Sequence, residues 1–157
     1  MENKFRYKAW ANQELLELVA QINKDTYPEQ LTTAVRLLNH TLVVDKIFIA
    51  HLQGLAHPFS ATNTPETPTL SQLKQRIEET DAWLINYARE LSPASLKEDV
   101  DFTFTDGVSG QMSRAEILDH LIIHGAYHRG NVGMLLTDCG LNRPADIFTR
   151  FLHLQDH

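Results

Sequence analysis

Residues 113–140 have the sequence SRAEILDHLIIHGAYHRGNVGMLLTDCG, and this stretch decides the fold. Ser113 is a favourable N-cap, and Glu116, three residues later, completes the capping box that begins many helices. Gly140 is the residue type that most often follows the end of a helix. The pattern therefore predicts one helix of about 25 residues, with several histidines repeated on one of its faces.

Three further segments have the periodicity of amphipathic helices: about Tyr7 to Ile22, about Leu31 to Leu52, and Leu70 to the residues just before Pro93. In each segment apolar residues recur at three- and four-residue steps, which places them on one helical face toward a core. Residues 54–69 contain three prolines and many small polar side chains, so they predict a long surface connection. Such a length permits a crossover along a bundle in place of a tight antiparallel hairpin.

The strand pattern in this chain comes directly before the fourth helix. Val100 to Thr105 alternates apolar and polar residues, residues 106–107 supply a turn, and Val108 to Met112 returns. Near the end of the chain, Ala145 to Leu154 predicts a short final helix. We therefore expect an all-α protein, a four-helix bundle with a small β-hairpin before the fourth helix and a short C-terminal helix.

The composition is typical of a globular protein that binds neither nucleic acid nor a membrane. Apolar residues make up 43% and charged residues 22% of the chain, which predicts a single domain spanning residues 1–157. The formal net charge of -6, without a local cluster of Lys and Arg, argues against binding to a phosphate backbone. No apolar run approaches the roughly 20 residues of a membrane span, and no secretory signal follows Met1, so we expect a cytoplasmic protein.

Cys139 is the only cysteine, so no intramolecular disulfide can form. This fits a reducing compartment. Because Cys139 falls near the end of the predicted fourth helix, the helix dipole disfavours its thiolate, and we favour a structural or bystander role over that of a nucleophile.

Two histidines of the predicted fourth helix, His124 and His128, are four residues apart and therefore near enough on one face to share an ion. Catalytic sites for zinc and related ions commonly have three protein ligands and an open position, so a third ligand must come from another helix. His40 is the best candidate, because it lies in the apolar stretch 37–44, where an unpaired ring would be costly to bury. A core histidine that hydrogen bonds to a neighbour explains His40 equally well on spacing alone.

The other histidines are weaker candidates. His120 lies one turn before His124 on the same face, so spacing alone does not decide which neighbouring two form the pair; we favour packing, or a hydrogen bond to a ligand, for His120. The remaining four lie at helix ends, in the long connection or near the terminus, where solvated or locally bonded side chains are expected. They are His51, His57, His153 and His157.

The sequence also resembles a known family. Residues 124–131, HGAYHRGN, resemble the H-x-x-x-H-R-G-Q signature of the DinB/YfiT-like family, with Asn131 where that family often has Gln. The resemblance covers most of the chain: KAWAN at residues 8–12 resembles the family's first helix, LLNH at residues 37–40 followed by Asp45 its second, and residues 102–110 its short hairpin.

The resemblance implies a four-helix core of up-down-down-up topology and frequent dimers, so we expect a homodimer. It also implies a metal held by one histidine of the second helix and two of the fourth, and His40, His124 and His128 match those ligands one by one. The ion is a divalent metal such as zinc, nickel or iron, since imidazole suits all three. Some relatives are thiol-dependent S-transferases or isomerases that use low-molecular-weight thiols such as bacillithiol or mycothiol.

Our first hypothesis is therefore a metal-dependent enzyme, a low-molecular-weight-thiol S-transferase in detoxification or stress response, with a small-molecule thiol and an electrophile as its partners. The alternative from another class is a non-catalytic, stress-induced dimeric metal-binding module. A metal-dependent hydrolase is a third hypothesis, although the sequence offers no obvious general base beyond histidine.

Asp45 and Arg129 are weaker candidates for this site. Asp45 could be an outer carboxylate beside the ligands, but a helix salt bridge is the favoured interpretation. Arg129 could steady an anionic substrate, and a helix-surface or dimer-contact role fits it equally well. Tyr127 and Trp10 could line the open side of the site, and core packing is favoured for both.

Overall fold

Four long helices dominate the computed structural model, which describes residues 1–155. In chain order the elements are α1 (Glu2–Val19), α2 (Pro28–Gln53), α3 (Leu70–Glu90), the 3-10 turn η1 (Ser95–Lys97), β1 (Asp99–Thr103), β2 (Ser109–Ser113), α4 (Arg114–Asp138) and α5 (Phe148–Gln155). The expected all-α bundle, with a small hairpin before the fourth helix and a short C-terminal helix, is confirmed. Within residues 1–155 no helix combines the length and the apolar character that crossing a bilayer requires.

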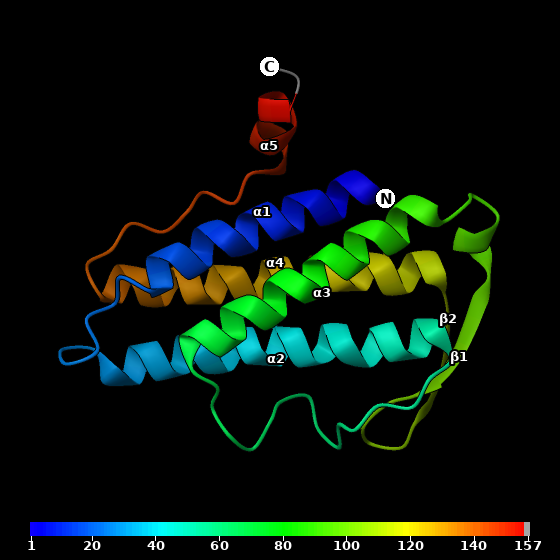
Figure 1. Ribbon diagram of the computed structural model, residues 1–157, viewed down its shortest axis with the longest axis horizontal. Coiled ribbons are helices and arrows are strands. Elements are labelled where there is room, and N and C mark those ends of the chain that lie inside the picture. Colours follow the sequence, from blue (N-terminus) through cyan, green and yellow to red (C-terminus); the bar gives the residue numbers. More distant parts are fainter. Residues whose placement is uncertain (156–157) are drawn as a thin grey trace.

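The long helices have the up-down-down-up arrangement (Figure 1). Helices α1 and α4 run in one direction, and α2 and α3 run in the other. Helix α1 packs against α3 and α4, and α2 packs against the same two helices. Because residues 54–69 return along the bundle, α3 can run parallel to α2, as expected for a long crossover.

Local signals explain where most helices begin. The capping box of Ser113 and Glu116 is present at the start of α4, and Thr69 with Gln72 forms a second one at the start of α3. Helix α2 begins at Pro28, earlier than expected, because proline lacks only a hydrogen bond that the first helical position does not make.

Two helices begin at other residues than the sequence predicted. Helix α1 begins at Glu2 instead of about Tyr7, because Phe5 is only 1% exposed and extends the buried face toward the N-terminus. Helix α5 begins at Phe148 instead of Ala145, because Asp146 has a left-handed backbone with φ of 52°.

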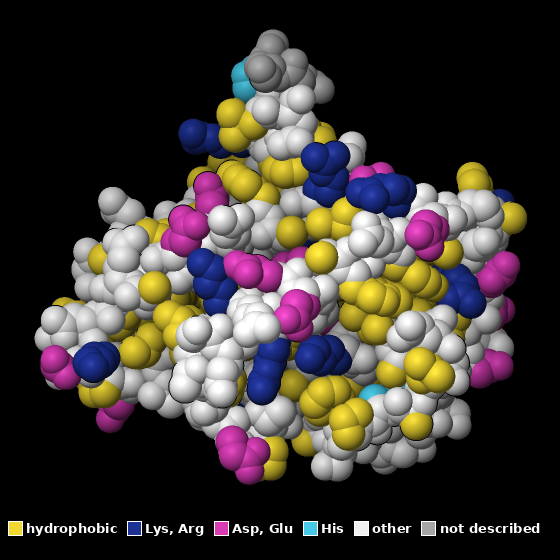
Figure 2. Space-filling model, in the orientation of Figure 1, with side chains coloured by type: hydrophobic (Ala, Val, Ile, Leu, Met, Phe, Trp, Pro, Cys, Tyr) yellow, Lys and Arg dark blue, Asp and Glu magenta, His cyan; other side chains and the backbone are white. Residues whose placement is uncertain are grey.

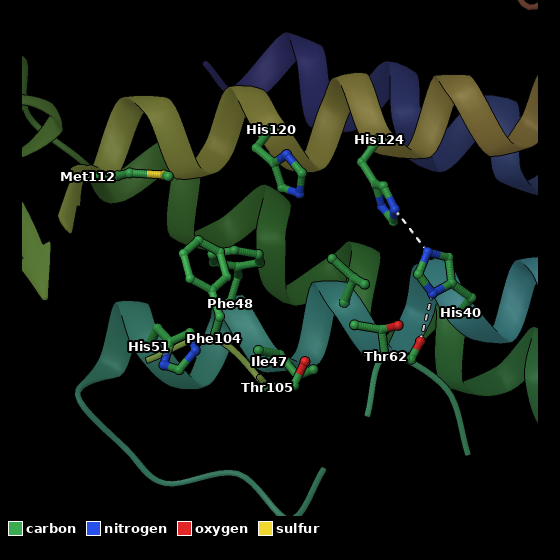
Figure 3. A pocket seen from close by; sticks show the side chains of 11 residues that line it. His40, Ile47, Phe48, His51, Thr62, Phe104, Thr105, Met112, His120 and His124 are labelled. Atoms are coloured by element: carbon green, nitrogen blue, oxygen red, sulfur yellow. Dashed lines mark hydrogen bonds between the residues drawn. The ribbon is translucent and has the colours of Figure 1, made fainter. Parts of the chain in front are cut away.

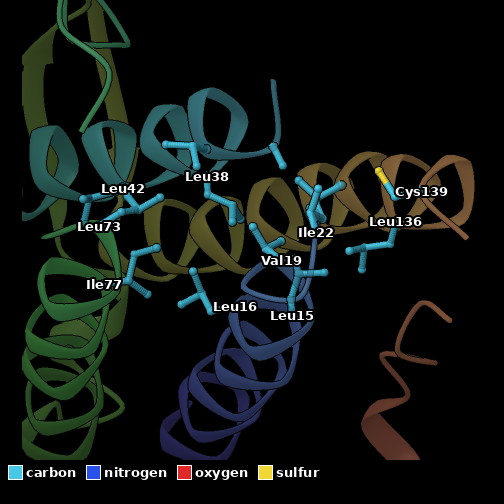
Figure 4. Close-up of a cluster of buried hydrophobic side chains, with 13 residues drawn as sticks. Leu15, Leu16, Val19, Ile22, Leu38, Leu42, Leu73, Ile77, Leu136 and Cys139 are labelled. Carbon is cyan, nitrogen blue, oxygen red and sulfur yellow. The ribbon is translucent and has the colours of Figure 1, made fainter. Parts of the chain in front are cut away.

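Two buried apolar clusters hold the bundle together at its two ends. The first lies where α1 and α4 end (Figure 4), and its members include Leu15, Leu16, Val19, Ile22, Leu38, Leu42, Leu73, Ile77, Leu136 and Cys139. The second lies at the opposite end, where the hairpin adds Val100 and Phe102 to residues such as Phe5, Leu84 and Leu121. Burying one such side chain contributes about 1.5–3 kcal/mol. The polar side chains of the bundle interior occupy the level between these clusters.

Candidate metal centre

The structure brings the three predicted ligands together. His40 projects from α2, and His124 and His128 project from successive turns of α4. Their candidate ligand atoms all lie within 4.8 Å of one another. The ring centroids are 4.9 Å apart for His40 and His124, 4.7 Å for His40 and His128, and 4.6 Å for His124 and His128. His120 lies outside this group and stacks on His124 at 5.3 Å.

Two hydrogen bonds fix the ring of His40 (Figure 3). Its Nδ1 donates to the backbone carbonyl of Thr62 at 2.7 Å, and its Nε2 lies 3.0 Å from Nε2 of His124. A neutral imidazole carries one proton, so the bond to Thr62 leaves the lone pair of His40 on Nε2, facing His124. Both of the interpretations that the sequence left open therefore describe His40: it bonds to a neighbour, and its free nitrogen points to the other histidines. It is only partly buried, which corrects the expected core position.

Asn39 bonds to the two residues that follow Thr62, and sequence reasoning missed it. The side chain of Asn39 is 1% exposed and donates to Asn63 Oδ1 at 2.6 Å and to Thr64 Oγ1 at 2.7 Å. Arg36 Nη1 adds a bond to the carbonyl of Thr64 at 2.7 Å. The sequence did contain a signal for this role: Asn39 is a polar amide within the apolar stretch 37–44, and a buried amide needs hydrogen-bond partners.

The electrostatics favour neutral ligands. Burial, with repulsion from neighbouring cationic groups, lowers the pKa of His124 to about 3. Burial and His40 also lower the pKa of His128. Metal binding requires a neutral imidazole. At neutral pH these two rings are already neutral, so each has a nitrogen lone pair available for an ion.

The donor set fits a divalent ion. Zinc–nitrogen bonds of about 2.0–2.1 Å place two nitrogens of a tetrahedral site about 3.4 Å apart, close to the 3.0 Å between His40 and His124. The Nδ1 atoms of His124 and His128 are buried and have no hydrogen-bond partner in residues 1–155. Such atoms are rare in folded proteins. In His124 the nitrogen that faces His40 is Nε2, so the fit to an ion rests on the distances between the rings and not on these Nδ1 atoms.

The sequence of this chain matches the DinB family over residues 1–157. The chain belongs to the DinB family. It is also similar to the protein DinB of Bacillus subtilis (strain 168), with 27% identity over 154 residues, which cover 90% of this chain and 88% of that protein. The resemblance drawn from the signature at residues 124–131 is thus confirmed.

Asp45 is neither an outer partner of the histidines nor part of a salt bridge within one helix. In this DinB family member it accepts a hydrogen bond from Lys8 Nζ of α1 at 2.6 Å, and Asp81 of α3 accepts another at 2.7 Å. Asn12 donates to Asp81 at 2.8 Å. All four side chains are buried. Burial raises the pKa of Asp45 to about 6, against the opposing effect of Lys8. The cluster joins three helices.

Arg129 is buried, 4% exposed, which corrects the expected helix-surface or dimer-contact role. Its Nε donates to Asp146 Oδ2 at 2.8 Å, and its Nη1 donates to Asn12 Oδ1 at 3.4 Å. Tyr7 donates its hydroxyl to the same carboxylate of Asp146. In this DinB family member Arg129, the residue after His128, therefore anchors the segment before α5.

The aromatic and remaining histidine predictions have mixed outcomes. Core packing is wrong for Tyr127, which is 69% exposed, while Trp10 packs on Phe151 with ring centroids 5.7 Å apart. Cys139 is buried in the first apolar cluster, and burial raises its thiol pKa, in line with a structural role. Solvated or locally bonded side chains were expected for His51 and His57, but each is partly buried and has one buried ring nitrogen without a hydrogen-bond partner in residues 1–155. His153 is exposed, and His157 lies outside the described residues.

Replacing Asn39 with alanine is expected to weaken zinc binding about 10- to 100-fold, the usual effect of losing a group that orients a metal ligand. The bundle should stay folded, because the partners of Asn39 lie on a surface connection where water can replace it. Competition with a chromogenic chelator measures the affinity, and circular dichroism checks the fold. The control is Asn86→Ala, an exposed asparagine of α3. Equal affinities for both variants would show that the connection does not orient His40.

Proposed function

We propose that this DinB family member is a divalent-metal-dependent enzyme that transfers a low-molecular-weight thiol to a small electrophile, in detoxification or stress response. One observation carries the proposal: three imidazoles from two helices converge beside a pocket, and two of them, His124 and His128, have lowered pKa values that keep them neutral. His40, His124 and His128 would hold the ion. Zinc, nickel and iron all remain compatible with this donor set.

A divalent ion with an open coordination position would supply positive charge that lowers the pKa of a thiol beside it. The side chains of this protein would then position the reactants. Thr62 and Asn39 keep the His40 ring oriented, and the apolar wall beside His40 and His124 keeps water from the electrophile. In the reaction, the thiol sulfur forms a bond to the electrophilic carbon, the leaving group departs with its electron pair, and the thiol proton passes to solvent.

The surface supports the rest of this proposal. Ile123, Tyr127 and Met134 of α4 are 68%, 69% and 53% exposed, which favours a homodimer that covers this helix. On the face shown in Figure 2, Lys and Arg side chains are interspersed with Asp and Glu, which favours small-molecule partners over nucleic acid. A cytoplasmic location, where thiols are kept reduced, belongs to the same proposal.

The test is thiol transfer to 1-chloro-2,4-dinitrobenzene. Protein loaded with zinc, nickel or iron(II) is expected to release chloride and form the thioether with at least one low-molecular-weight thiol, faster than chelator-treated protein. His128→Ala should remove this difference. Loaded protein that is no faster than chelator-treated protein with every thiol would contradict the proposal and favour the non-catalytic dimeric module. Ester hydrolysis without thiol transfer would favour the hydrolase.

A further inference from the structure

A pocket of about 300 Å³ lies between α2 and α4, next to the three histidines. This volume is at the lower end of the range for small-molecule sites, about 300–1,000 Å³. Its walls are mainly apolar and aromatic. The lining side chains from the two helices are His40, Val44, Ile47, Phe48, His51, His120 and His124.

The pocket has two polar ends with apolar walls between them (Figure 3). His40 and His124 stand at one end, and His51 stands at the other, beyond Ile47 and Phe48. The rise of about 1.5 Å per residue separates His40 from His51 by about 16 Å along α2. An elongated molecule can therefore reach both ends at once.

The lining carries no formal charge. Among the described residues, no Lys, Arg, Asp or Glu contributes to it. Burial lowers the pKa of His51, so this ring is neutral at pH 7. Away from the end formed by His40 and His124, where a bound ion would supply positive charge, an anionic group would lose its hydration without gaining a counter-charge, which is unfavourable. Without the ion, the pocket therefore selects uncharged molecules.

His51 offers one unused polar atom at the far end of the pocket. Its Nε2 is buried and has no hydrogen-bond partner in residues 1–155. The ring is held by stacking on Phe102, with centroids 5.1 Å apart, and by edge contacts with Phe48 at 5.8 Å and with His57 at 5.2 Å. A fixed ring with an unpaired nitrogen suits a ligand that brings one hydroxyl or carbonyl group.

Two connections cover the open side of the pocket. Thr62 comes from residues 54–69, and Phe104 and Thr105 come from the hairpin turn. Phe104 is 38% exposed, so it contributes little to the core and can be changed without loss of the fold. Its ring lies edge to face against Phe102, with centroids 4.9 Å apart.

We propose that this pocket binds the electrophile: an uncharged, mostly apolar and preferably aromatic molecule with one polar group on His51 Nε2 and its reactive carbon at the end formed by His40 and His124. This inference rests on the proposed function. It assigns the charged portion of a thiol substrate to the solvent side of the histidines, outside the apolar walls.

Binding of three bicyclic probes tests the inference on the full chain. 1-Naphthol is neutral with one hydroxyl group, 2-methylnaphthalene is neutral without one, and 1-naphthoate is an anion; probe fluorescence reports binding. To chelator-treated protein, where no ion attracts a carboxylate, 1-naphthol should bind at least about tenfold more tightly than 1-naphthoate. His51→Phe, which keeps the stacking, should weaken 1-naphthol binding about tenfold and change 2-methylnaphthalene binding less than about threefold. His153→Phe, at an exposed histidine of α5 outside the lining, should change neither.

A second pair of variants tests whether the hairpin turn covers the pocket. Phe104→Ala should weaken the binding of both neutral probes. Val108→Ala, which changes an exposed residue of the same hairpin turn, should not. Circular dichroism shows whether each variant is folded. Equal affinity of chelator-treated protein for 1-naphthol and 1-naphthoate, or a His51→Phe protein that binds 1-naphthol like the wild type, would overturn the pocket assignment.

The same measurements separate this inference from the proposed function. Chelator-treated protein should still bind 1-naphthol within about threefold of loaded protein, because the walls do not need the ion. The expected probe pattern in a protein without metal or thiol transfer would overturn only the proposed function. Thiol transfer in a protein without that pattern would overturn only the pocket inference.

Discussion

His124→Ala is expected to abolish metal binding. The imidazole of His124 contacts both other rings of the group, and its Nε2 faces Nε2 of His40 at 3.0 Å, so its loss leaves two donors that do not define a site. Loss of a group that merely orients a ligand lowers affinity about 10- to 100-fold, and loss of a ligand must exceed this. Zinc content after dialysis, measured by atomic emission, should fall from about one ion per chain to near zero.

Thermal unfolding gives a second readout for the same variant. Zinc at a thousand times its Kd should stabilise the wild type by about 4 kcal/mol and should leave the His124→Ala protein unchanged. The matched control is His120→Ala, one turn earlier on the same face and outside the group of three. Should His120→Ala lose zinc while His124→Ala keeps it, the ligand set would be wrong and His120 would take the place of His124.

Lys8→Met is expected to destabilise the fold by about 3–5 kcal/mol, because it leaves two buried carboxylates without their cation. Lys8 is 2% exposed and bridges Asp45 of α2 and Asp81 of α3. These are the two helices that the 54–69 connection joins. Unfolding in urea measures the change as a shift of the midpoint at constant slope.

Lys4→Met is the matched control for this change. Lys4 lies one turn before Lys8 on α1 and pairs with Asp119 at the same 2.7 Å that separates Lys8 from Asp81, but its side chain is 46% exposed. Solvent screens such a pair, so the effect should stay within roughly 1 kcal/mol. Similar midpoints for the two variants would mean that the buried cluster contributes no more than a surface ion pair.

Local signals allowed most of the fold to be predicted from the sequence. The capping box at Ser113 and Glu116, and the apolar periodicity of each long helix, depend on residues only three or four apart. The starts of α1 and α5 were misplaced because they depend on contacts with distant residues. Phe5 packs into a cluster with the hairpin, and Asp146 pairs with Arg129 of α4.

The same distinction separates the two halves of the site. The four-residue spacing of His124 and His128 is a local pattern, and the structure does bring both rings to His40. The partners of Lys8 lie 37 and 73 residues further along the chain, so nothing near Lys8 in the sequence indicates that this lysine is buried. The surface role expected for Arg129 failed for this reason, and so did the helix salt bridge expected for Asp45.

The two connections that cover the pocket have an evolutionary consequence. Thr62 and Phe104 lie on segments whose length and composition can change while α2 and α4 keep their apolar contacts. Exchanges in the hairpin turn would alter which molecules are admitted and leave the imidazoles where they are, whereas exchanges in residues 54–69 must keep the carbonyl of Thr62 to which His40 bonds. Grafting the hairpin turn from one relative onto another is therefore a direct route to chimeras with new selectivity.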